Sequence, residues 1–169
     1  MNYFLQNFLW IAYFYLLQNL LIMLKETLPG LFERELNKLK EDLNLYKDES
    51  TIWQLRGTIS NSAGNLCLHL IGNLEHFIGA TLGRTGYIRK REEEFALKNI
   101  PRIEMLNSID HVIDVINTTL SELHESDFNK KFPLEKHGEI ETTEFMMLHL
   151  LAHLNYHLGQ INYHRRLIN

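Results

Sequence analysis

The spacing of apolar residues along the chain predicts helices throughout. In residues 31–45 apolar side chains recur every three or four positions, which places them on one helix face, and charged side chains fill the opposite face. The same spacing predicts three further helices, over residues 62–82, 103–123 and 143–167. N-capping side chains precede two of them, at Asn61 or Ser62 and at Thr142 or Thr143. Since no segment alternates long enough to predict a sheet, we expect an all-α fold, an antiparallel-type four-helix bundle.

An apolar stretch precedes this pattern. Residues 1–24 carry no charged side chain and approach the ~20 apolar residues that cross a bilayer. Four amides interrupt the stretch, at Gln6, Asn7, Gln18 and Asn19. A secretory signal is not predicted, because no Lys or Arg comes before the apolar run and no small-residue cleavage site follows it.

Three interpretations of this stretch remain open: a dispensable extension ahead of a functional start at Met23, a membrane anchor, or an extra packing helix. We therefore divide the chain into an N-terminal extension, residues 1–22, and a bundle domain, residues 23–169. We expect a cytoplasmic protein, or a membrane-anchored one if the extension is an anchor.

The connecting segments and the second helix have distinct patterns. Residues 48–60 are rich in turn-forming residues, and we expect Trp53 to fix this loop onto the bundle. Residues 87–98 are strongly charged and predict a short helix or an ordered loop, and residues 128–139 predict a polar connection. The helix over residues 62–82 carries three glycines on nearly one stripe, at Gly64, Gly72 and Gly79. Each costs ~1 kcal/mol relative to alanine, so we expect another helix or a ligand to approach closely there.

Charge and histidine content narrow the function. A net charge of −4 and a pI of about 6.1 give no basic field for a nucleic-acid backbone, so no nucleic-acid partner is expected. The single cysteine, Cys67, allows no intramolecular disulfide, and we expect it to be a small core residue. Nine histidines are unusual for this length. Five lie in helical, apolar contexts, where an imidazole needs partners for its ring nitrogens: His69, His149, His153, His157 and His164.

The last helix carries three of these histidines at steps of four. His149, His153 and His157 therefore lie one turn apart on the same side, and two neighbours can converge on one metal ion. All three cannot, since the outer two are separated by two turns, roughly 11–12 Å. The third ligand is expected from another helix. His69 is the candidate, because Asn65 and Asn73 extend a polar stripe on both sides of it.

Such a site would suit one divalent ion such as Zn²⁺, Ni²⁺ or Fe²⁺ and would leave a coordination position for water or substrate. Water bound to such an ion reaches a pKa of about 7 and becomes a usable nucleophile or base. The alternative is a bundle lined by hydrogen-bonded histidines without metal. That alternative needs buried carboxylates or amides as partners, and the sequence offers Asn65, Asn73 and Gln160.

The motifs resemble a known superfamily. HLLAHLNYHLGQINYHRR in the last helix resembles the C-terminal signature of the DinB-like (YfiT-like) metalloprotein superfamily, where His-x-x-x-His precedes Gly-Gln. NSAGNLCLHLIGNLEHFIG resembles the matching signature of the second helix, and REEEF fits the same uncharacterised branch. The resemblance covers the chain from about Met23 to its C-terminus and implies a four-helix bundle of the DinB/YfiT-like type.

The resemblance also implies a site. It assigns the metal to His69, His153 and His157, with His149 and Gln160 lining or orienting the centre. Characterised relatives include thiol S-transferases that use a low-molecular-weight thiol, so the resemblance implies a small thiol cosubstrate. Related bundles often pair, so it also implies a homodimer. Two hypotheses follow: a metal-dependent thiol S-transferase or hydrolase, and a non-catalytic metal-binding bundle. A fourth protein ligand, such as His149, would favour the second.

The remaining polar residues have simpler interpretations. The basic residues after the second helix could bind carboxylates of a thiol, but a solvated charge run balanced by residues 92–94 is the simpler interpretation. These basic residues are Arg84, Arg89, Lys90 and Arg91. Four histidines are expected at the surface or behind the ligands: His76, His111, His124 and His137.

Overall fold

The computed structural model describes residues 3–135 and 140–168, and within residues 3–23 it describes the backbone and the side chain of Trp10. The described residues are helical and hold no β-strand, only an isolated antiparallel bridge between Lys131 and Thr142. This confirms the expected all-α class. The elements in chain order are α1 (Tyr3–Asn44), η1 (Glu49–Trp53), α2 (Ala63–Leu74), η2 (Glu75–Ala80), α3 (Arg91–Ala96), α4 (Arg102–Glu122), α5 (Glu125–Phe128) and α6 (Thr143–Ile168).

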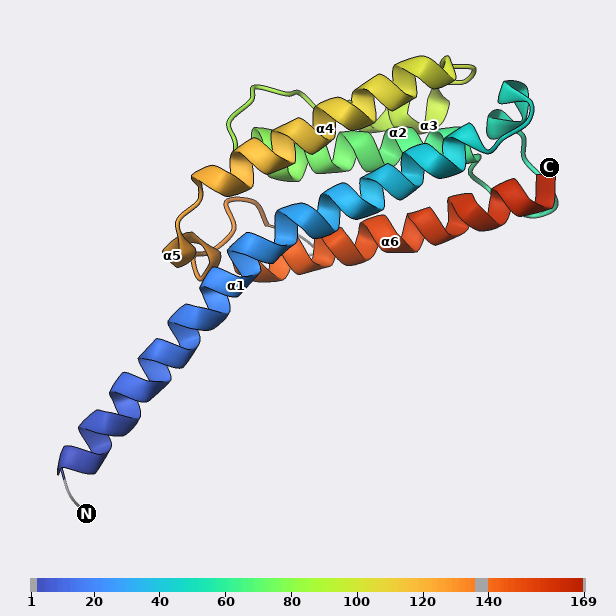
Figure 1. Cartoon of the computed structure of the whole chain (residues 1–169). Helices are drawn as coiled ribbons and strands as arrows, with labels where there is room; N and C mark the ends of the chain where they lie inside the picture. The colour runs from blue at the N-terminus through green and yellow to red at the C-terminus, as the bar shows by residue number, and fades with distance from the viewer. Residues whose placement is uncertain (1–2, 136–139, 169) are drawn as a thin grey trace.

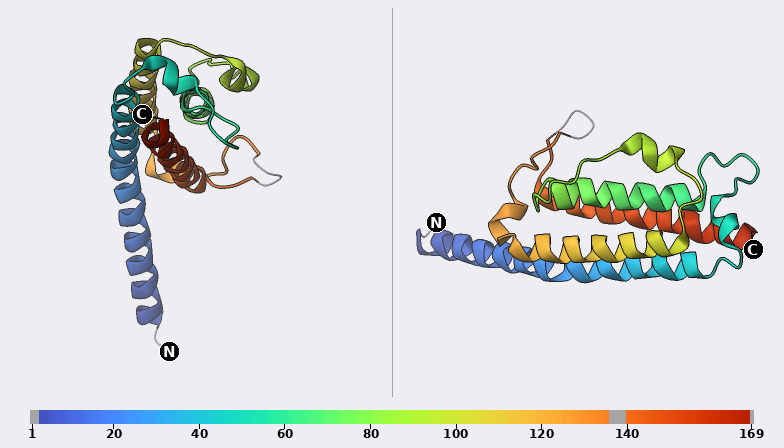
Figure 2. Two further views of the ribbon diagram at one scale, coloured as in Figure 1. Left: turned by 90° about the vertical axis from the view of Figure 1, so that its right-hand side faces the viewer. Right: turned by 90° about the horizontal axis from the view of Figure 1, so that it is seen from above.

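Four long helical segments lie side by side: α1, α2 with its continuation η2, α4, and α6 (Figure 1). α1 contacts α4 and α6, and α2 contacts α4 and α6. The short α3 lies against α2, on the outside of this group (Figure 2). Helices α2 and α6 run in opposite directions, so residues early in α2 face residues late in α6.

The core follows the apolar spacing of the sequence. On α1 the fully buried side chains recur every three or four residues, at Leu28, Phe32, Leu36, Leu39 and Leu43. α4 contributes Ile109, Ile113, Ile116 and Leu120, at the same spacing. α6 contributes mainly Met147, Leu150, Leu154, Leu158 and Ile161. These stripes point inward because a repeat of 3.6 residues per turn keeps such positions on one face.

The first helix differs most from the sequence expectation. It was expected over residues 31–45, but α1 begins at Tyr3 and continues through Pro29. Pro29 removes one backbone N–H donor, which is a local cost and does not end the helix. The apolar residues upstream contain no further proline or glycine that would interrupt it. The N-terminal part of α1 extends away from the other helices (Figures 1 and 2). Among the residues whose side chains are described, no helix combines the length and apolar character needed to cross a bilayer.

Two predicted details of the second helix are confirmed. Ser62 is the N-cap of α2, and its hydroxyl accepts a hydrogen bond from the backbone N–H of Asn65 at 3.2 Å. Trp53 is buried and lies so close to Gly64 that a Cβ there would stand 2.6 Å from the indole ring. The loop is therefore fixed onto α2 by an aromatic ring that only glycine admits. The helix changes at Glu75, where η2 forms a π-helical turn in place of the expected α-helix.

Candidate metal centre

Three of the predicted histidines meet between α2 and α6. His69 comes from α2, and His153 and His157 come from successive turns of α6. One nitrogen of each ring lies within 4.8 Å of the others. The Nε2 atom of His153 lies 3.3 Å from Nε2 of His69 and 3.0 Å from Nε2 of His157.

These separations suit a tetrahedral metal ion. Zn–N bonds of about 2.0–2.1 Å at tetrahedral angles put neighbouring nitrogens about 3.3–3.4 Å apart. A neutral imidazole has one lone pair and one N–H, so three ring nitrogens that face one another cannot all be satisfied by hydrogen bonds among themselves. A cation accepts all three lone pairs at once. The residues present therefore fit a divalent ion.

In His69 and His157 the nitrogen that points away from the cluster has an acceptor. His69 Nδ1 lies 2.8 Å from Oε2 of Glu94, and His157 Nδ1 lies 2.7 Å from Oε1 of Gln160. A carboxylate and an amide oxygen only accept, so each Nδ1 carries the proton and each Nε2 keeps its lone pair toward the centre. Burial lowers the pKa of His157 although the hydrogen bond to Gln160 opposes this shift, so the neutral form of the ring is favoured.

Glu94 is held in a buried ion pair. Arg89 donates two hydrogen bonds to its carboxylate, with Nε 2.7 Å from Oε1 and Nη2 2.9 Å from Oε2. Burial disfavours the charged form of Glu94, but the hydrogen bonds from His69 and Arg89 outweigh it and hold the pKa of this carboxyl below its ordinary value. Glu94 therefore remains an anion, with 6% of its surface exposed, beside His69.

Two features of α2 bring Glu94 to this place. The amide nitrogen of Asn65 donates to the backbone carbonyls of Glu94 and Leu97, both at 3.0 Å, and so ties the α3 segment to α2. Gly72 lies directly beneath the carboxylate of Glu94, and a Cβ at that position would collide with Oε1. Close approach along the glycine stripe was expected from the sequence, and Gly72 provides it at the candidate centre.

The other histidines lie outside the cluster. His149 stacks on His153 with ring centroids 6.5 Å apart and is not part of the three-nitrogen group. His76 is half-buried, while His111 and His124 are exposed, as expected; His137 lies outside the described residues. His164 is buried, with Nδ1 2.6 Å from the hydroxyl of Tyr46 and Nε2 2.9 Å from the carbonyl of Gln54. It is a hydrogen-bonded core histidine.

The prediction for Cys67 is confirmed, and the prediction for the basic segment after α2 is wrong in part. Cys67 is fully buried, and burial raises the pKa of its thiol to about 12, so it is a core residue as expected. The expectation of a solvated charge run after α2 is wrong at Arg89 and Glu94, which form the buried pair. The carboxylate of Glu94 uses the guanidinium of Arg89, so Arg89 is not a docking point for a thiol carboxylate.

Comparison with known proteins gives one clear result. A family model described as "Protein of unknown function (DUF1572)" matches residues 26–169. The chain belongs to the DUF1572 family. The match spans every helix of the candidate centre, from the C-terminal part of α1 to α6, and begins after the apolar stretch. No curated protein matches this DUF1572 chain significantly.

Sequence reasoning on this DUF1572 member missed Glu94. It lies 25 residues from His69 along the chain, and no spacing relates the two. One signal was present: an inward histidine on α2 needs an acceptor for its second nitrogen, and three consecutive glutamates, residues 92–94, follow that helix. Which of the three turns inward depends on how α3 packs, and the sequence pattern does not show it.

Proposed function

We propose that this chain is a divalent-metal-dependent enzyme of the DinB-like superfamily, with a four-helix bundle of the DinB type. In this proposal His69, His153 and His157 hold one ion, and the enzyme transfers a low-molecular-weight thiol to an electrophile. The observation that carries the proposal is the convergence of the three rings: Nε2 of His153 lies 3.3 Å from Nε2 of His69 and 3.0 Å from Nε2 of His157.

The surrounding contacts support a built centre. Glu94 and Gln160 fix the protonation of two of the rings, which is the usual arrangement behind metal-ligating histidines. Three protein ligands with a remaining open position are typical of catalytic rather than structural zinc sites. His149 is not among the clustered nitrogens, so within the described residues the cluster supplies three ligands, which favours the enzyme over the closed structural site.

The reaction would be a nucleophilic substitution. A bound divalent ion would supply a Lewis-acid position at which a thiol or a water loses its proton near neutral pH. The thiol proton leaves to solvent, the sulfur forms a bond to a carbon of the electrophile, and the leaving group departs with the electrons of its bond. His69, with its proton held at Nδ1 by Glu94, keeps the geometry of the centre during this exchange. Metal-dependent hydrolysis remains the alternative reaction at the same centre.

Elemental analysis tests the metal. We expect about one divalent ion per purified chain, and its loss in His69→Ala and His153→Ala. His111→Ala is the matched control, because His111 is exposed and lies outside the cluster. Unchanged metal content in both cluster variants would refute the assignment of the ligands.

An activity assay tests the reaction class. The metal-loaded protein is mixed with bacillithiol, glutathione or cysteine and a halo-bimane, and the fluorescent thioether is followed. We expect a rate above that of the thiol alone for at least one thiol, lost with His153→Ala. No enhancement with any thiol would refute the transferase and favour a hydrolase or a non-catalytic metal-binding bundle.

A further inference from the structure

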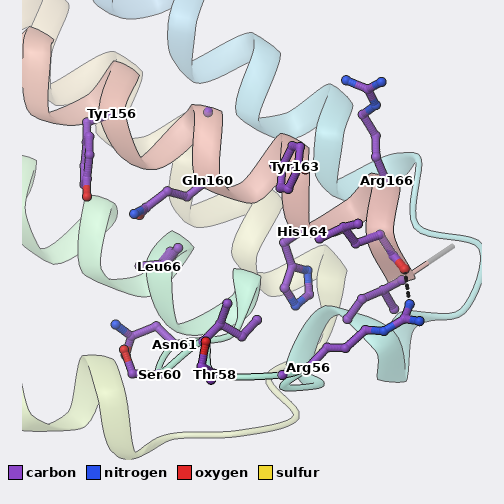
Figure 3. Close-up of a pocket in the computed structure, with 15 residues that line it drawn as sticks. Arg56, Thr58, Ser60, Asn61, Leu66, Tyr156, Gln160, Tyr163, His164 and Arg166 are labelled. Atoms are coloured by element: carbon purple, nitrogen blue, oxygen red, sulfur yellow. Dashed lines mark hydrogen bonds between the residues drawn. The ribbon is translucent and has the colours of Figure 1, made fainter.

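A pocket lies beside the histidine cluster, toward the C-terminal end of α6. It has a volume of about 1110 Å³ and lies between α6, the start of α2 and the loop of residues 56–61 (Figure 3). Pockets for small organic molecules usually measure about 300–1,000 Å³, so this one has room for an extended ligand. The sequence predicts a turn-rich loop here, and neither the metal centre nor the ion pair at Glu94 uses it.

The pocket begins one helical turn from the candidate metal centre. Leu66 lines it from α2 and lies three residues before His69, and Gln160 lines it from α6, three residues after His157. Three residues correspond to about 4.5 Å along a helix axis. Figure 3 shows Gln160 and Tyr156 extending from α6 toward α2. Gln160 therefore has two contacts at this junction: it binds Nδ1 of His157 and forms part of the pocket wall.

Among the residues that the structure describes, the charged side chains that line the pocket are those of two arginines. Arg56 and Arg166 line it, and no aspartate or glutamate is among its lining residues in the described part of the chain. Arg56 contacts the backbone carbonyl of Leu167 through Nη1, which holds its side chain across the end of α6 (Figure 3). This contact does not use the edge of the guanidinium formed by Nε and Nη2. That edge can bind a carboxylate with two parallel hydrogen bonds. Arg166 points away from Arg56 in Figure 3.

The distance between Arg56 and the histidine cluster sets the length of a ligand that contacts both. Leu167 follows His157 by ten residues, about 15 Å along α6. An anionic group held at Arg56 would therefore lie roughly that distance from the histidine cluster, with Leu66 and the rings of Tyr156 and Tyr163 along the path. A single amino acid is too short for this span, since an extended chain covers at most ~3.3–3.6 Å per residue. A tripeptide backbone covers about 10–11 Å, so a molecule of that size spans the distance only with the added length of its side chains.

We infer that this pocket binds the carboxylate end of an elongated small organic acid whose reacting end lies at His69, His153 and His157. The inference rests on the proposed function for the reacting end, while the carboxylate subsite at Arg56 stands on the pocket itself. The carboxylate is bound by Arg56, and the apolar part of the ligand lies against Leu66.

Binding of S-methylglutathione tests the subsite without a free thiol. This tripeptide thioether has two carboxylates, and its diethyl ester has none. Isothermal titration with the full chain should give saturable binding of the acid, with the ester at least tenfold weaker, since a charge-assisted pair accounts for about one order of magnitude in affinity. Arg56→Gln should weaken the acid about tenfold and remove the preference over the ester, whereas Arg56→Lys should keep part of that preference.

Controls separate this inference from its alternatives. Arg166→Gln removes the same charge from the same pocket and should change the affinity by less than about threefold, because its guanidinium points elsewhere. Titrations of metal-free and zinc-loaded protein distinguish the two proposals, since the carboxylate preference should persist without metal even if the metal proposal fails. Circular dichroism checks that Arg56→Gln is folded, because that change also removes a contact to α6.

Three results would overturn the inference: no saturable binding to the wild-type chain, equal binding of acid and ester, or an Arg56→Gln variant that binds the acid like the wild type. Shifts of the backbone amides of Gly57 and Gly159 in NMR spectra should accompany binding, since both residues line the pocket. Shifts confined to other regions would also contradict it.

Discussion

Replacing Glu94 with glutamine should weaken metal binding without changing any proposed ligand. In the wild-type chain the carboxylate accepts from His69 and from Arg89, and both contacts need an acceptor. A glutamine has one acceptor end and one donor end. If its oxygen faces His69, its NH₂ group meets the guanidinium of Arg89, donor against donor. If its NH₂ group faces His69, the ring proton moves to Nε2 and blocks the nitrogen that points to the metal.

The size of the effect follows from these two contacts. Loss of the hydrogen-bond partner behind a metal-ligating histidine typically costs 10–100-fold in metal affinity, or about 1.4–2.7 kcal/mol. Arg89 would also lose its carboxylate, with only 13% of its side chain exposed. Removal of one partner of a buried ion pair destabilises a protein by about 3–5 kcal/mol, and we expect the lower end or less, because glutamine retains one acceptor.

A competition titration against a chromophoric zinc chelator measures this directly. We expect the dissociation constant for Zn²⁺ to rise by one to two orders of magnitude in Glu94→Gln. Glu93→Gln is the matched control: Glu93 is exposed and pairs with Lys90, so its replacement should leave the zinc affinity within about twofold. Thermal unfolding of both metal-free variants shows that they are folded at the assay temperature. A folded Glu94→Gln variant with the wild-type zinc affinity would refute the role of Glu94 in orienting His69.

Two further predictions concern stability. Gly64→Ala should destabilise the chain by about 1–3 kcal/mol, because its Cβ would stand 2.6 Å from the ring of Trp53. Gly30→Ala, whose Cβ would meet nothing within 4 Å, should be neutral or stabilise the chain by about 0.5–1 kcal/mol. Equal shifts in the thermal melts of the two variants would contradict the packing argument. Burial, only partly offset by His111, raises the pKa of Glu75 above its ordinary value of 4.5. The contribution of Glu75 to stability is therefore present below pH 4.5 and is lost as the pH rises through the raised pKa. Glu75→Gln should therefore melt higher than the wild type at neutral pH and lose this advantage below about pH 4.5, and the reverse pattern across a pH series of melts would disprove it.

Local patterns in the sequence predicted most of the bundle. The core stripes of α4 and α6, the cap at Ser62 and the inward position of Trp53 depend on neighbours within a few residues, which a sequence displays. The proximity of His153 and His157 is of the same kind, since helix geometry alone fixes it. His69 required a second step, the pairing of polar stripes on two different helices. The interpretations of residues 1–22 and the homodimer are predictions from the sequence.

Contacts without any regular spacing were not predictable. Glu94 reaches His69 through a loop and one short helix, and the buried His164 reaches Tyr46 across 118 positions. In both cases the sequence shows an imidazole in need of a partner but not which residue meets it. The pocket at Arg56 is of this kind too, because it exists only where the loop of residues 56–61 passes over the end of α6.

The costs in stability are concentrated around His69, and this favours a functional explanation. A glycine inside a helix, a buried ion pair and clustered imidazole lone pairs each lower stability or contribute little to it. Gly72, the pair of Arg89 with Glu94, and the three histidines all lie in one contact network. A bundle selected for stability alone would place alanine and leucine at such positions, as the core of α4 does with its isoleucines. Each unfavourable group instead holds Nε2 of His69 in place with its lone pair directed at His153, and this arrangement is of use only if something binds there.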